Sequence, residues 1–325
     1  MSTWHKLKWP LIALAVALLF NLAFTRNFFH IEIKDGHLYG SLVDVVNRGA
    51  PVMLLALGMT LVIATGGVDL SVGAVMAITG AVAALQVNAG QPLPVVYLVS
   101  LGAALAAGLW NGALVGFLKV PPIVATLVLM VSGRGIAQLL TDGQHIRFNH
   151  PAFEFIGRGH LFGVPFTFTL VAAMFIVLSL LCTKTPAGLF LEATGDNERA
   201  SRYAGVQTRL VQFVAYAVCA LCAGLAGLIV TTNVQEADPS SAGLGLELDA
   251  ILATVIGGTA LTGGRFYLGG SLVGAILLQT ITTTILTRDV PVNWTLVVKA
   301  AVIISVCLLQ SESFRAALLR RRPAA

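Results

Sequence analysis

Long apolar segments alternate with short polar segments along almost the whole chain. Read with a window of about 20 residues, the length of helix that crosses a bilayer, this pattern predicts ten membrane-spanning helices. They cover residues 9–25, 50–66, 70–88, 93–118, 122–141, 164–183, 210–232, 248–262, 267–287 and 291–310. No linker or low-complexity segment interrupts the series. We therefore predict an all-α, polytopic membrane protein in which residues 1–325 form a single transmembrane domain.

The second and eighth segments are short, and both run into a Thr-Gly-Gly motif, at residues 65–67 and 262–264. An even division into two five-helix halves would make the halves inverted repeats, as in some transporters. The two motifs do not fall at matching places in such halves. They therefore give no support for an internal repeat.

The overall composition points to lipid as the main solvent. Hydrophobic residues make up 57% of the chain and charged residues 11%, and the mean hydropathy is +0.86. Soluble domains are about half apolar and about a quarter charged, so a soluble fold of this size could not hide so much apolar surface. The net charge of +5 is not gathered into a basic stripe with aromatic residues, so no nucleic-acid partner is expected.

The first apolar segment follows Lys6 and Lys8 and resembles a secretory signal. The small-residue cleavage pattern is missing at its exit, where Phe24, Thr25 and Arg26 stand. More apolar segments follow, so we expect an uncleaved first membrane helix.

The distribution of Lys and Arg predicts the orientation, because short cytoplasmic loops collect these residues. With the amino terminus inside, twelve lie inside, six lie outside, and Arg134 and Lys299 fall within spans. The inside set is Lys6, Lys8, Lys119, Lys184, Arg199, Arg202, Arg209, Arg265, Arg315, Arg320, Arg321 and Arg322, and the outside set is Arg26, Lys34, Arg48, Arg147, Arg158 and Arg288. Both termini are therefore predicted to be cytoplasmic, together with the polar segment 185–210.

Glycines recur at four-residue spacing in two of the predicted spans. Gly108, Gly112 and Gly116 share one face of the fourth span, and Gly270 and Gly274 share one face of the ninth. In lipid, such faces let helices approach closely and pack by van der Waals contact. The pattern predicts a tightly packed bundle.

The segment ATGGVDLSVGAV, residues 64–75, interrupts the apolar pattern with two glycines. Asp69 and Ser71 are both suited to cap the helix that resumes after it. One interpretation is a broken helix inside the bundle, whose free amide groups face a polar solute. The other is a tight cytoplasmic turn capped by Asp69, and the sequence does not decide between them.

Few ionisable residues fall within or at the edge of spans: Asp69, Arg134, Glu247, Asp249 and Lys299. Each is costly in hydrocarbon and is expected to face the protein interior or an edge. Structural pairing of Arg134 and Lys299 with the acidic residues is favoured over catalysis. The small number also argues against a proton-driven carrier, which commonly uses a relay of intramembrane acids.

Motifs for catalysis, metal binding or cofactor binding are absent from the sequence. There is no GxxxxGK[ST], HExxH or GxSxG, and the six histidines are scattered singly. Cys219 and Cys222 lie in an apolar segment, where burial disfavours the thiolate that binds metal. We expect no catalytic residue, no metal site and no cofactor.

The polar segment 185–210 contains residues that can begin and end a short helix. Asp196 or Asn197 can cap a helix that begins near Glu198, and Gly205 is placed to end it. Ala200 and Ala204 would share one face of that helix. A capped helix with a small-residue face is suited to dock in a partner's groove, and we favour docking over a plain solvated loop.

Four blocks of sequence resemble the membrane-spanning permeases of bacterial sugar ABC importers, the group of the ribose, xylose, galactose and galactofuranose systems. The blocks are GMTLVIATGGVDLSVGAVMA at 58–77, ATLVLMVSGRG at 125–135, GLFLEATGDNERASRYAGV at 188–206 and LELDAILATVIGGTALTGGR at 246–265. The details of DGHLYGSLVDVVNRGAP at 35–51 and DGQHIRFNHPAF at 142–153 are most similar to the galactofuranose-type permeases.

This resemblance implies a type II-like permease of the bacterial inner membrane that moves a monosaccharide, galactofuranose or a similar sugar, by alternating access. The implied partners are an ATP-binding subunit that hydrolyses ATP, a periplasmic sugar-binding protein and a second permease, identical or related, all in membrane lipid. The polar segment, about residues 184–210, would be the coupling segment that sits on the ATPase. The residues expected to couple are Glu192, Ala193, Gly195, Asn197, Ala200, Ala204 and Gly205.

Residues of the solute pathway are chosen from polarity alone, and they are Asp69, Ser71, Asn111, Gln279 and Thr282. The ninth span reads LLQTITTTIL at 277–286, where related permeases often have an Asn-Gly pair, so a sugar contact there does not follow from the resemblance. Threonine hydroxyls also often bond back to their own helix.

Two other classes of function are compatible with parts of the pattern. An independent secondary carrier for a polar solute would transport without an ATPase. A membrane scaffold or enzyme would need a partner or reaction for which the sequence carries no motif.

Overall fold

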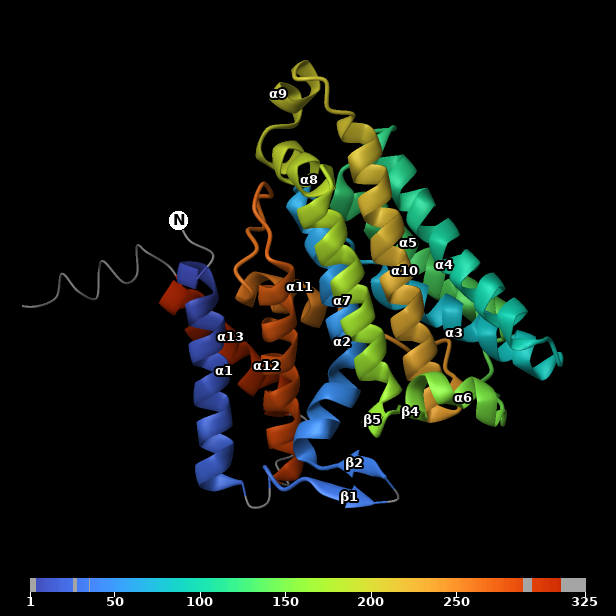
Figure 1. Cartoon of the computed structure of the whole chain (residues 1–325). Coiled ribbons are helices and arrows are strands. Elements are labelled where there is room, and N and C mark those ends of the chain that lie inside the picture. The colour runs from blue at the N-terminus through green and yellow to red at the C-terminus, as the bar shows by residue number, and fades with distance from the viewer. Residues whose placement is uncertain (1–3, 26–27, 35, 289–293, 311–325) are drawn as a thin grey trace, which may run out of the picture.

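The computed structural model describes residues 4–25, 28–34, 36–288 and 294–310, which form a helical bundle with loops at its two ends (Figure 1). The helices are α1 Trp4–Phe24, α2 Ser41–Ala64, α3 Val72–Asn88, α4 Leu93–Gly116, α5 Pro122–Leu140, α6 Pro151–Arg158, α7 Phe166–Lys184, α8 Ala187–Asp196, α9 Glu198–Tyr203, α10 Thr208–Val234, α11 Leu246–Ile256, α12 Leu268–Thr287 and α13 Trp294–Gln310. The all-α, multi-span class predicted from the sequence is confirmed.

Six of the described helices are long and apolar enough to cross a membrane: α2, α4, α5, α7, α10 and α12. α3 and the Lys8–Phe24 part of α1 are apolar but shorter. Every one of the ten predicted segments coincides with a helix, although residues 291–293 of the last segment lie outside the described residues. The number of complete crossings stays a prediction.

The second and eighth predicted segments have the wrong extents. α2 starts nine residues earlier than predicted, at Ser41 rather than at residue 50, because the helix continues through polar residues beyond its apolar part. α11 has only 11 residues and ends at Ile256, which at 1.5 Å per residue is about 16 Å, half the thickness of a hydrocarbon core of about 30 Å. A hydropathy window of about 20 residues averages over this short helix and the turn that follows it, so it cannot separate them.

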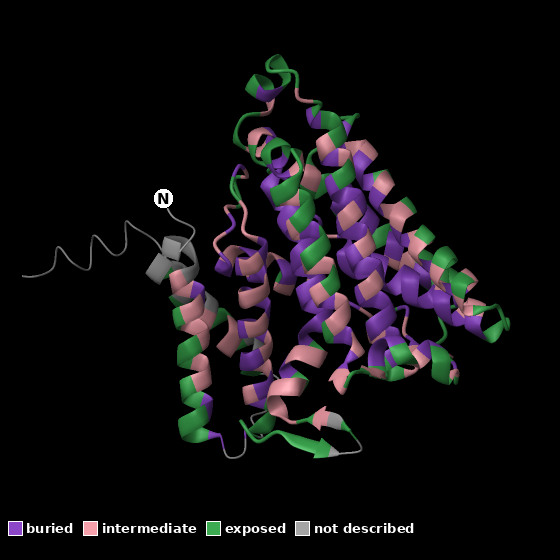
Figure 2. Ribbon diagram, in the orientation of Figure 1, coloured by how far each residue is buried: buried purple, intermediate pink, exposed green. Residues whose placement is uncertain are grey.

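The core of the bundle is built around α2 and α10, and the outer helices expose apolar faces. α2 and α10 pack against each other, and most of their residues are buried (Figure 2). α4, α5 and α7 are buried only on one side, and large aliphatic side chains such as Leu98, Val131 and Leu139 are at least 70% exposed. Exposed apolar faces of this extent belong against lipid.

Glycines make the closest contacts between the helices. A Cβ atom added to Gly112 of α4 would lie 2.7 Å from the carbonyl oxygen of Phe213 on α10. A Cβ added to Gly274 of α12 would overlap the carbonyl oxygen of Ala253 on α11. The predicted tight packing at both glycine faces is confirmed, since the helices meet backbone to backbone there.

Two helices, α3 and α11, begin inside the bundle rather than at its ends. Ala74, in the first turn of α3, contacts Gly133 in the middle of α5. The next residue of α5, Arg134, donates a 2.6 Å hydrogen bond from Nη1 to the carbonyl of Ala242, in the loop before α11. A Cβ on Gly73 would lie 2.5 Å from the carbonyl oxygen of Gly243 in the same loop. The loop between α10 and α11 therefore enters the bundle as far as the middle of α5.

The loops at the two ends of the bundle differ in kind. α8 and α9 stand at one end, toward which the start of α1 also points, and α6 lies with the β1–β2 and β4–β5 hairpins at the other (Figure 1). The antiparallel pairs are β1 Glu32–Lys34 with β2 His37–Tyr39, β3 Ile146–Arg147 with β6 Glu236–Ala237, and β4 His160–Leu161 with β5 Val164–Pro165. One end thus carries the polar segment singled out from the sequence.

Replacing Gly112 by Ala should destabilise the protein, because the new methyl group would be pressed against the backbone of α10. Overpacking of a tight contact costs about 1–3 kcal/mol. Gly102 lies on the same helix with nothing within 4 Å of an added Cβ, so Gly102→Ala is the matched control and should be neutral or slightly stabilising. Thermal inactivation of the detergent-purified variants measures both. Equal melting temperatures for the two would contradict the packing described.

Candidate coupling surface and transport pathway

The polar segment folds into two short helices with the cap predicted for the second. The side-chain oxygen of Asn197 accepts a 3.0 Å hydrogen bond from the amide of Ala200. α9 ends at Tyr203, and Gly205 follows with a φ of +87°. Ser201 Oγ donates a 2.7 Å hydrogen bond to the carbonyl of Ala193, which ties α9 to α8.

Most of the residues predicted to couple are exposed on this end of the molecule. Glu192, Asn197, Ala200, Ala204 and Gly205 are exposed, while Ala193 and Gly195 are partly covered. Tyr203 is 94% exposed beside the two alanines. An open surface of small residues with one projecting aromatic ring is a suitable seat for a partner.

An ionic cluster centred on Glu198 fixes α9 to the bundle. The carboxylate of Glu198 accepts hydrogen bonds from Lys119 Nζ and from Arg202, and Thr208 Oγ1 lies 3.3 Å from it. Lys119 Nζ also donates a 3.0 Å hydrogen bond to Gln212 on α10. Partial burial alone would raise the pKa of Glu198, but the hydrogen bonds from Lys119 and Arg202 outweigh it and lower this pKa. We call Lys119, Glu198, Arg202, Thr208 and Gln212 the Glu198 cluster.

Replacing Lys119 by Met should loosen α9 without unfolding the bundle. The change keeps the length of the side chain and removes its charge and its hydrogen bonds to two helices. Because partly exposed ion pairs contribute little, amide hydrogen exchange in α9 should rise about two- to fivefold, measured by mass spectrometry. Lys184→Met, at an exposed lysine at the end of α7, is the control. Unchanged exchange in Lys119→Met would show that the cluster does not hold α9.

The segment between α2 and α3 is a turn that is largely covered by other helices. Asp69 accepts hydrogen bonds from the amide (2.9 Å) and from the hydroxyl (2.6 Å) of Ser71, and Asn111 of α4 donates to Ser71 Oγ at 2.9 Å. Tyr216 of α10 donates to the carbonyl of Val68 at 3.3 Å. The Asp69 carboxylate thus binds the amide of Ser71 within the turn, and α3 begins after Ser71 with no side-chain cap. Asp69 and Ser71 are buried in protein, and which of the two interpretations holds stays open.

Three of the five residues chosen for the solute pathway meet at this turn, and two do not. Asp69, Ser71 and Asn111 are at most 1% exposed, and Asn111 Oδ1 has no hydrogen-bond partner among the described residues. Gln279 lies on α12 against Gly49 of α2. Thr282 donates its hydroxyl to the carbonyl of Leu278, 2.9 Å away on its own helix. Gln279 and Thr282 of α12 thus do not lie with Asp69, Ser71 and Asn111.

One of the predicted intramembrane ion pairs is present. Lys299 of α13 lies 2.8 Å from the carboxylate of Asp249 on α11. Arg134 instead donates to the Ala242 carbonyl. Glu247 is 8% exposed, and in the described part of the chain its Oε2 lacks a hydrogen-bond partner. A Cβ on Gly73 would lie 2.7 Å from this oxygen, which places the carboxylate at the first turn of α3, where the helix dipole favours negative charge.

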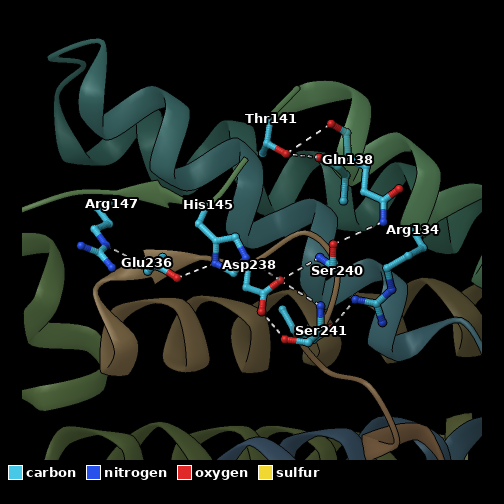
Figure 3. A network of polar contacts seen from close by, with 11 residues as sticks. Arg134, Gln138, Thr141, His145, Arg147, Glu236, Asp238, Ser240 and Ser241 are labelled. Atoms are coloured by element: carbon cyan, nitrogen blue, oxygen red, sulfur yellow. Dashed lines mark hydrogen bonds and ion pairs between the residues drawn. The ribbon is translucent and has the colours of Figure 1, made fainter. Parts of the chain in front are cut away.

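A second polar network, at the other end of the molecule, joins β3 to β6 (Figure 3). Glu236 accepts from Arg147 Nε at 2.7 Å and lies 2.6 Å from His145 Nδ1. Asp238 accepts from the amides of Ser240 at 2.8 Å and Ser241 at 2.9 Å. The network anchors the start of the loop that enters the bundle before α11.

The pKa values in this network shift in the directions that its hydrogen bonds require. The hydrogen bond to Glu236 raises the pKa of His145 above 6.5. Hydrogen bonds from Arg147 and His145 lower the pKa of Glu236 below 4.5. The contribution of His145 is therefore complete below about pH 6.5 and is lost as the pH rises through its raised pKa, whereas that of Glu236 is lost only as the pH falls below 4.5.

Raising the pH from 6 to 8.5 should loosen the β3–β6 pair, because His145 loses its charge. After correction for intrinsic exchange, the protection of the Phe148 amide, which donates to the Gln235 carbonyl at 3.3 Å, should fall about twofold. His145→Gln should show no such pH dependence. If both proteins give the same pH profile, His145 does not control the pair.

Comparison with known proteins places the chain among transport permeases. Residues 41–307 match the family described as the branched-chain amino acid transport system permease component. The galactofuranose transporter permease protein YtfT of Escherichia coli K12 is 49% identical over 315 residues, covering 95% of this chain and 92% of the relative. The fructose import permease FruF of Bifidobacterium longum is 38% identical (94% and 87% covered), and the ribose import permease RbsC of Escherichia coli K12 is 34% identical (96% and 95%). No solved structure matches.

The apolar outer faces and the six long apolar helices of the described residues are those of a multi-pass membrane protein. The family match covers most of the chain, and the chain belongs to this family of transport-system permease components. The resemblance to the sugar-importer permeases drawn from the sequence is confirmed.

Sequence reasoning missed the Glu198 cluster and the His145–Glu236 network. Lys119 is 79 residues from Glu198, and His145 is 91 residues from Glu236. The sequence singled out Lys119 only as an inside charge, Glu198 only as the start of a helix and His145 only as one of the scattered histidines, and Glu236 not at all. No local pattern joins such distant residues, whereas the Asn197 cap was readable because it acts over three positions.

Proposed function

We propose that this chain is the membrane-spanning subunit of an ABC importer that carries galactofuranose or a similar monosaccharide from the periplasm to the cytoplasm. The single observation that carries the proposal is the α8–α9 segment, a capped and exposed pair of helices in a protein whose other exposed faces are largely apolar. The substrate follows from the 49% identical relative, which is named for galactofuranose transport.

In this proposal the chain performs no covalent chemistry. An ATP-binding subunit binds α8 and α9, and its closure around ATP moves these two helices relative to the bundle. The Glu198 cluster links α9 to α10 and to the loop before α5, so movement of α9 is biased toward moving them as well. In response to this movement, the bundle alternates between an outward-open and an inward-open arrangement.

The proposed orientation puts α8, α9 and both termini in the cytoplasm. The excess of Lys and Arg on this side supports it. The opposite end, with α6 and the small sheets, then faces the periplasm and receives the sugar-binding protein. A second permease, identical or related, completes the pathway between the two subunits in the lipid bilayer.

The solute pathway is proposed to pass the turn that carries Asp69, Ser71 and Asn111. Asn111 Oδ1 is a buried acceptor with no partner among the described residues, and sugar hydroxyls are donors that can satisfy such a group. Gln279 and Thr282 stay in the proposal as pathway residues on α12.

Replacing Ala200 and Ala204 together by Trp should prevent association with the ATP-binding subunit, because two indole rings would fill the small-residue face of α9. The change is measured by co-purification of the ATP-binding subunit with the tagged permease from membranes that express both. We expect at least a tenfold loss, with membrane insertion intact. Leu98→Trp is the control for adding the same ring, because Leu98 is 76% exposed on the lipid-facing side of α4.

Normal co-purification and normal uptake of labelled galactofuranose by the Ala200→Trp, Ala204→Trp protein would overturn the proposed coupling role. Uptake by the purified chain alone, in liposomes with an ion gradient and no ATP, would identify a secondary carrier instead.

A further inference from the structure

Three segments that are far apart in the sequence meet at the carboxyl end of α8. They are the end of α2 with Gly66, the end of α8 with Gly195, and the turn between α11 and α12 with Gly263 and Gly264. The amide of Gly264 donates a 3.0 Å hydrogen bond to the carbonyl of Ala64, the last residue of α2. We call these four glycines the glycine junction.

The contacts in the glycine junction are made by backbone atoms with no side chain between them. A Cβ on Gly195 would overlap the carbonyl oxygen of Ala64 and the amide nitrogen of Gly264. A Cβ on Gly263 would lie 2.8 Å from the amide nitrogen of Gly66 and 3.0 Å from the carbonyl oxygen of Gly195. Gly66, Gly263 and Gly264 also have φ angles of +81°, +84° and +81°, a region that L-residues with a side chain rarely adopt.

The junction accounts for the two Thr-Gly-Gly motifs that the sequence left without a role. They are not equivalent parts of a repeat. They are the two surfaces between which Gly195 is enclosed, one at the end of α2 and the other between α11 and α12.

Contacts of this kind transmit displacement better than contacts between side chains. A flexible side chain can absorb a shift of an ångström by changing rotamer, whereas packed backbone cannot yield without moving its whole element. The other attachment of the α8–α9 segment, the Glu198 cluster, consists of long and partly exposed side chains.

The elements on both sides of the junction lead to the interior of the bundle. From Gly66 the chain runs through Asp69 and Ser71 into α3, which begins in the middle of the bundle. The opposite turn joins α12 to α11, the other helix that begins there. One displacement of α8 therefore reaches the start of α3 and the end of α11.

The outer side of the junction is open. A cleft of about 530 Å³ lies between α8 and the α11–α12 turn. It is lined by Leu189, Glu192, Ala193, Asp196, Gly264, Arg265 and Tyr267. A partner seated on α8 can therefore enter the cleft and reach the turn as well.

We propose that Gly195, with Gly66, Gly263 and Gly264, is the positioning contact through which movement of the coupling segment is passed to α2 and to the α11–α12 turn. The inference rests on the proposed function. It adds that coupling enters the bundle where a Cβ on Gly195 would overlap the backbone of α2 and of the α11–α12 turn.

The test uses Gly195→Ala in the full complex with the ATP-binding subunit and the binding protein, reconstituted in proteoliposomes. Because Gly195 belongs to the coupling segment, ATP hydrolysis and co-purification of the ATP-binding subunit are measured alongside transport. The labelled galactofuranose carried per ATP hydrolysed should fall at least tenfold. Gly269→Ala is the control, because Gly269 lies in the first turn of α12 with nothing within 4 Å of an added Cβ.

An unchanged ratio of sugar carried to ATP hydrolysed in Gly195→Ala would overturn the inference, and this includes a proportional fall of uptake and hydrolysis. Should Gly195→Ala fail to insert in the membrane, Gly264→Ala decides the matter by the same ratio, because its added Cβ would lie 3.1 Å from Asp196 and an alanine at a φ of +81° strains the junction. A wild-type complex that neither holds the ATP-binding subunit nor carries the sugar would refute the proposed function itself, which is a different outcome.

Discussion

The close approach of bare backbone to bare backbone is the interaction on which this structure depends. Lipid tails are as apolar as leucine, so burying apolar side chains between helices gains little in a bilayer, and association relies on close packing. α10 shows the result: it meets α2 at Gly58, α4 at Gly112 and α3 through Gly227. The chain has 33 glycines, and several of those between helices lie where two main chains touch.

The same constraint determines where the chain can leave its helices. Backbone that is not helical must find hydrogen-bond partners inside the protein when it lies at membrane depth. In the turn at Asp69, the amide of Ser71 donates to the Asp69 carboxylate and the carbonyl of Val68 accepts from Tyr216. The loop before α11 is satisfied in part by Arg134. The polar residues of the spans thus hold irregular backbone in place before any role in transport is considered.

How far the sequence could predict the structure depended on the range of each interaction. Hydropathy located every helix that carries an apolar run, and a three-residue cap located the start of α9. The end of α11 was missed because Gly257 to Thr262 is apolar on average although it forms turns. Asp69 and Ser71 were recognised from their spacing, but the contact of Asn111 with them depends on packing across 40 residues, which polarity alone does not specify. The α12 residues chosen by the same criterion lie elsewhere for that reason.

The shortness of α11 has a consequence for how the protein is made. Eleven residues that include Glu247 and Asp249 are too few and too polar to partition from the translocon into lipid as an independent unit. The carboxylate of Glu247 lies against α3, the loop backbone is bound by Arg134 of α5, and Asp249 pairs with Lys299 of α13, which emerges from the ribosome after α11. Assembly of this region therefore cannot be complete until α13 has been made and Lys299 can neutralise Asp249.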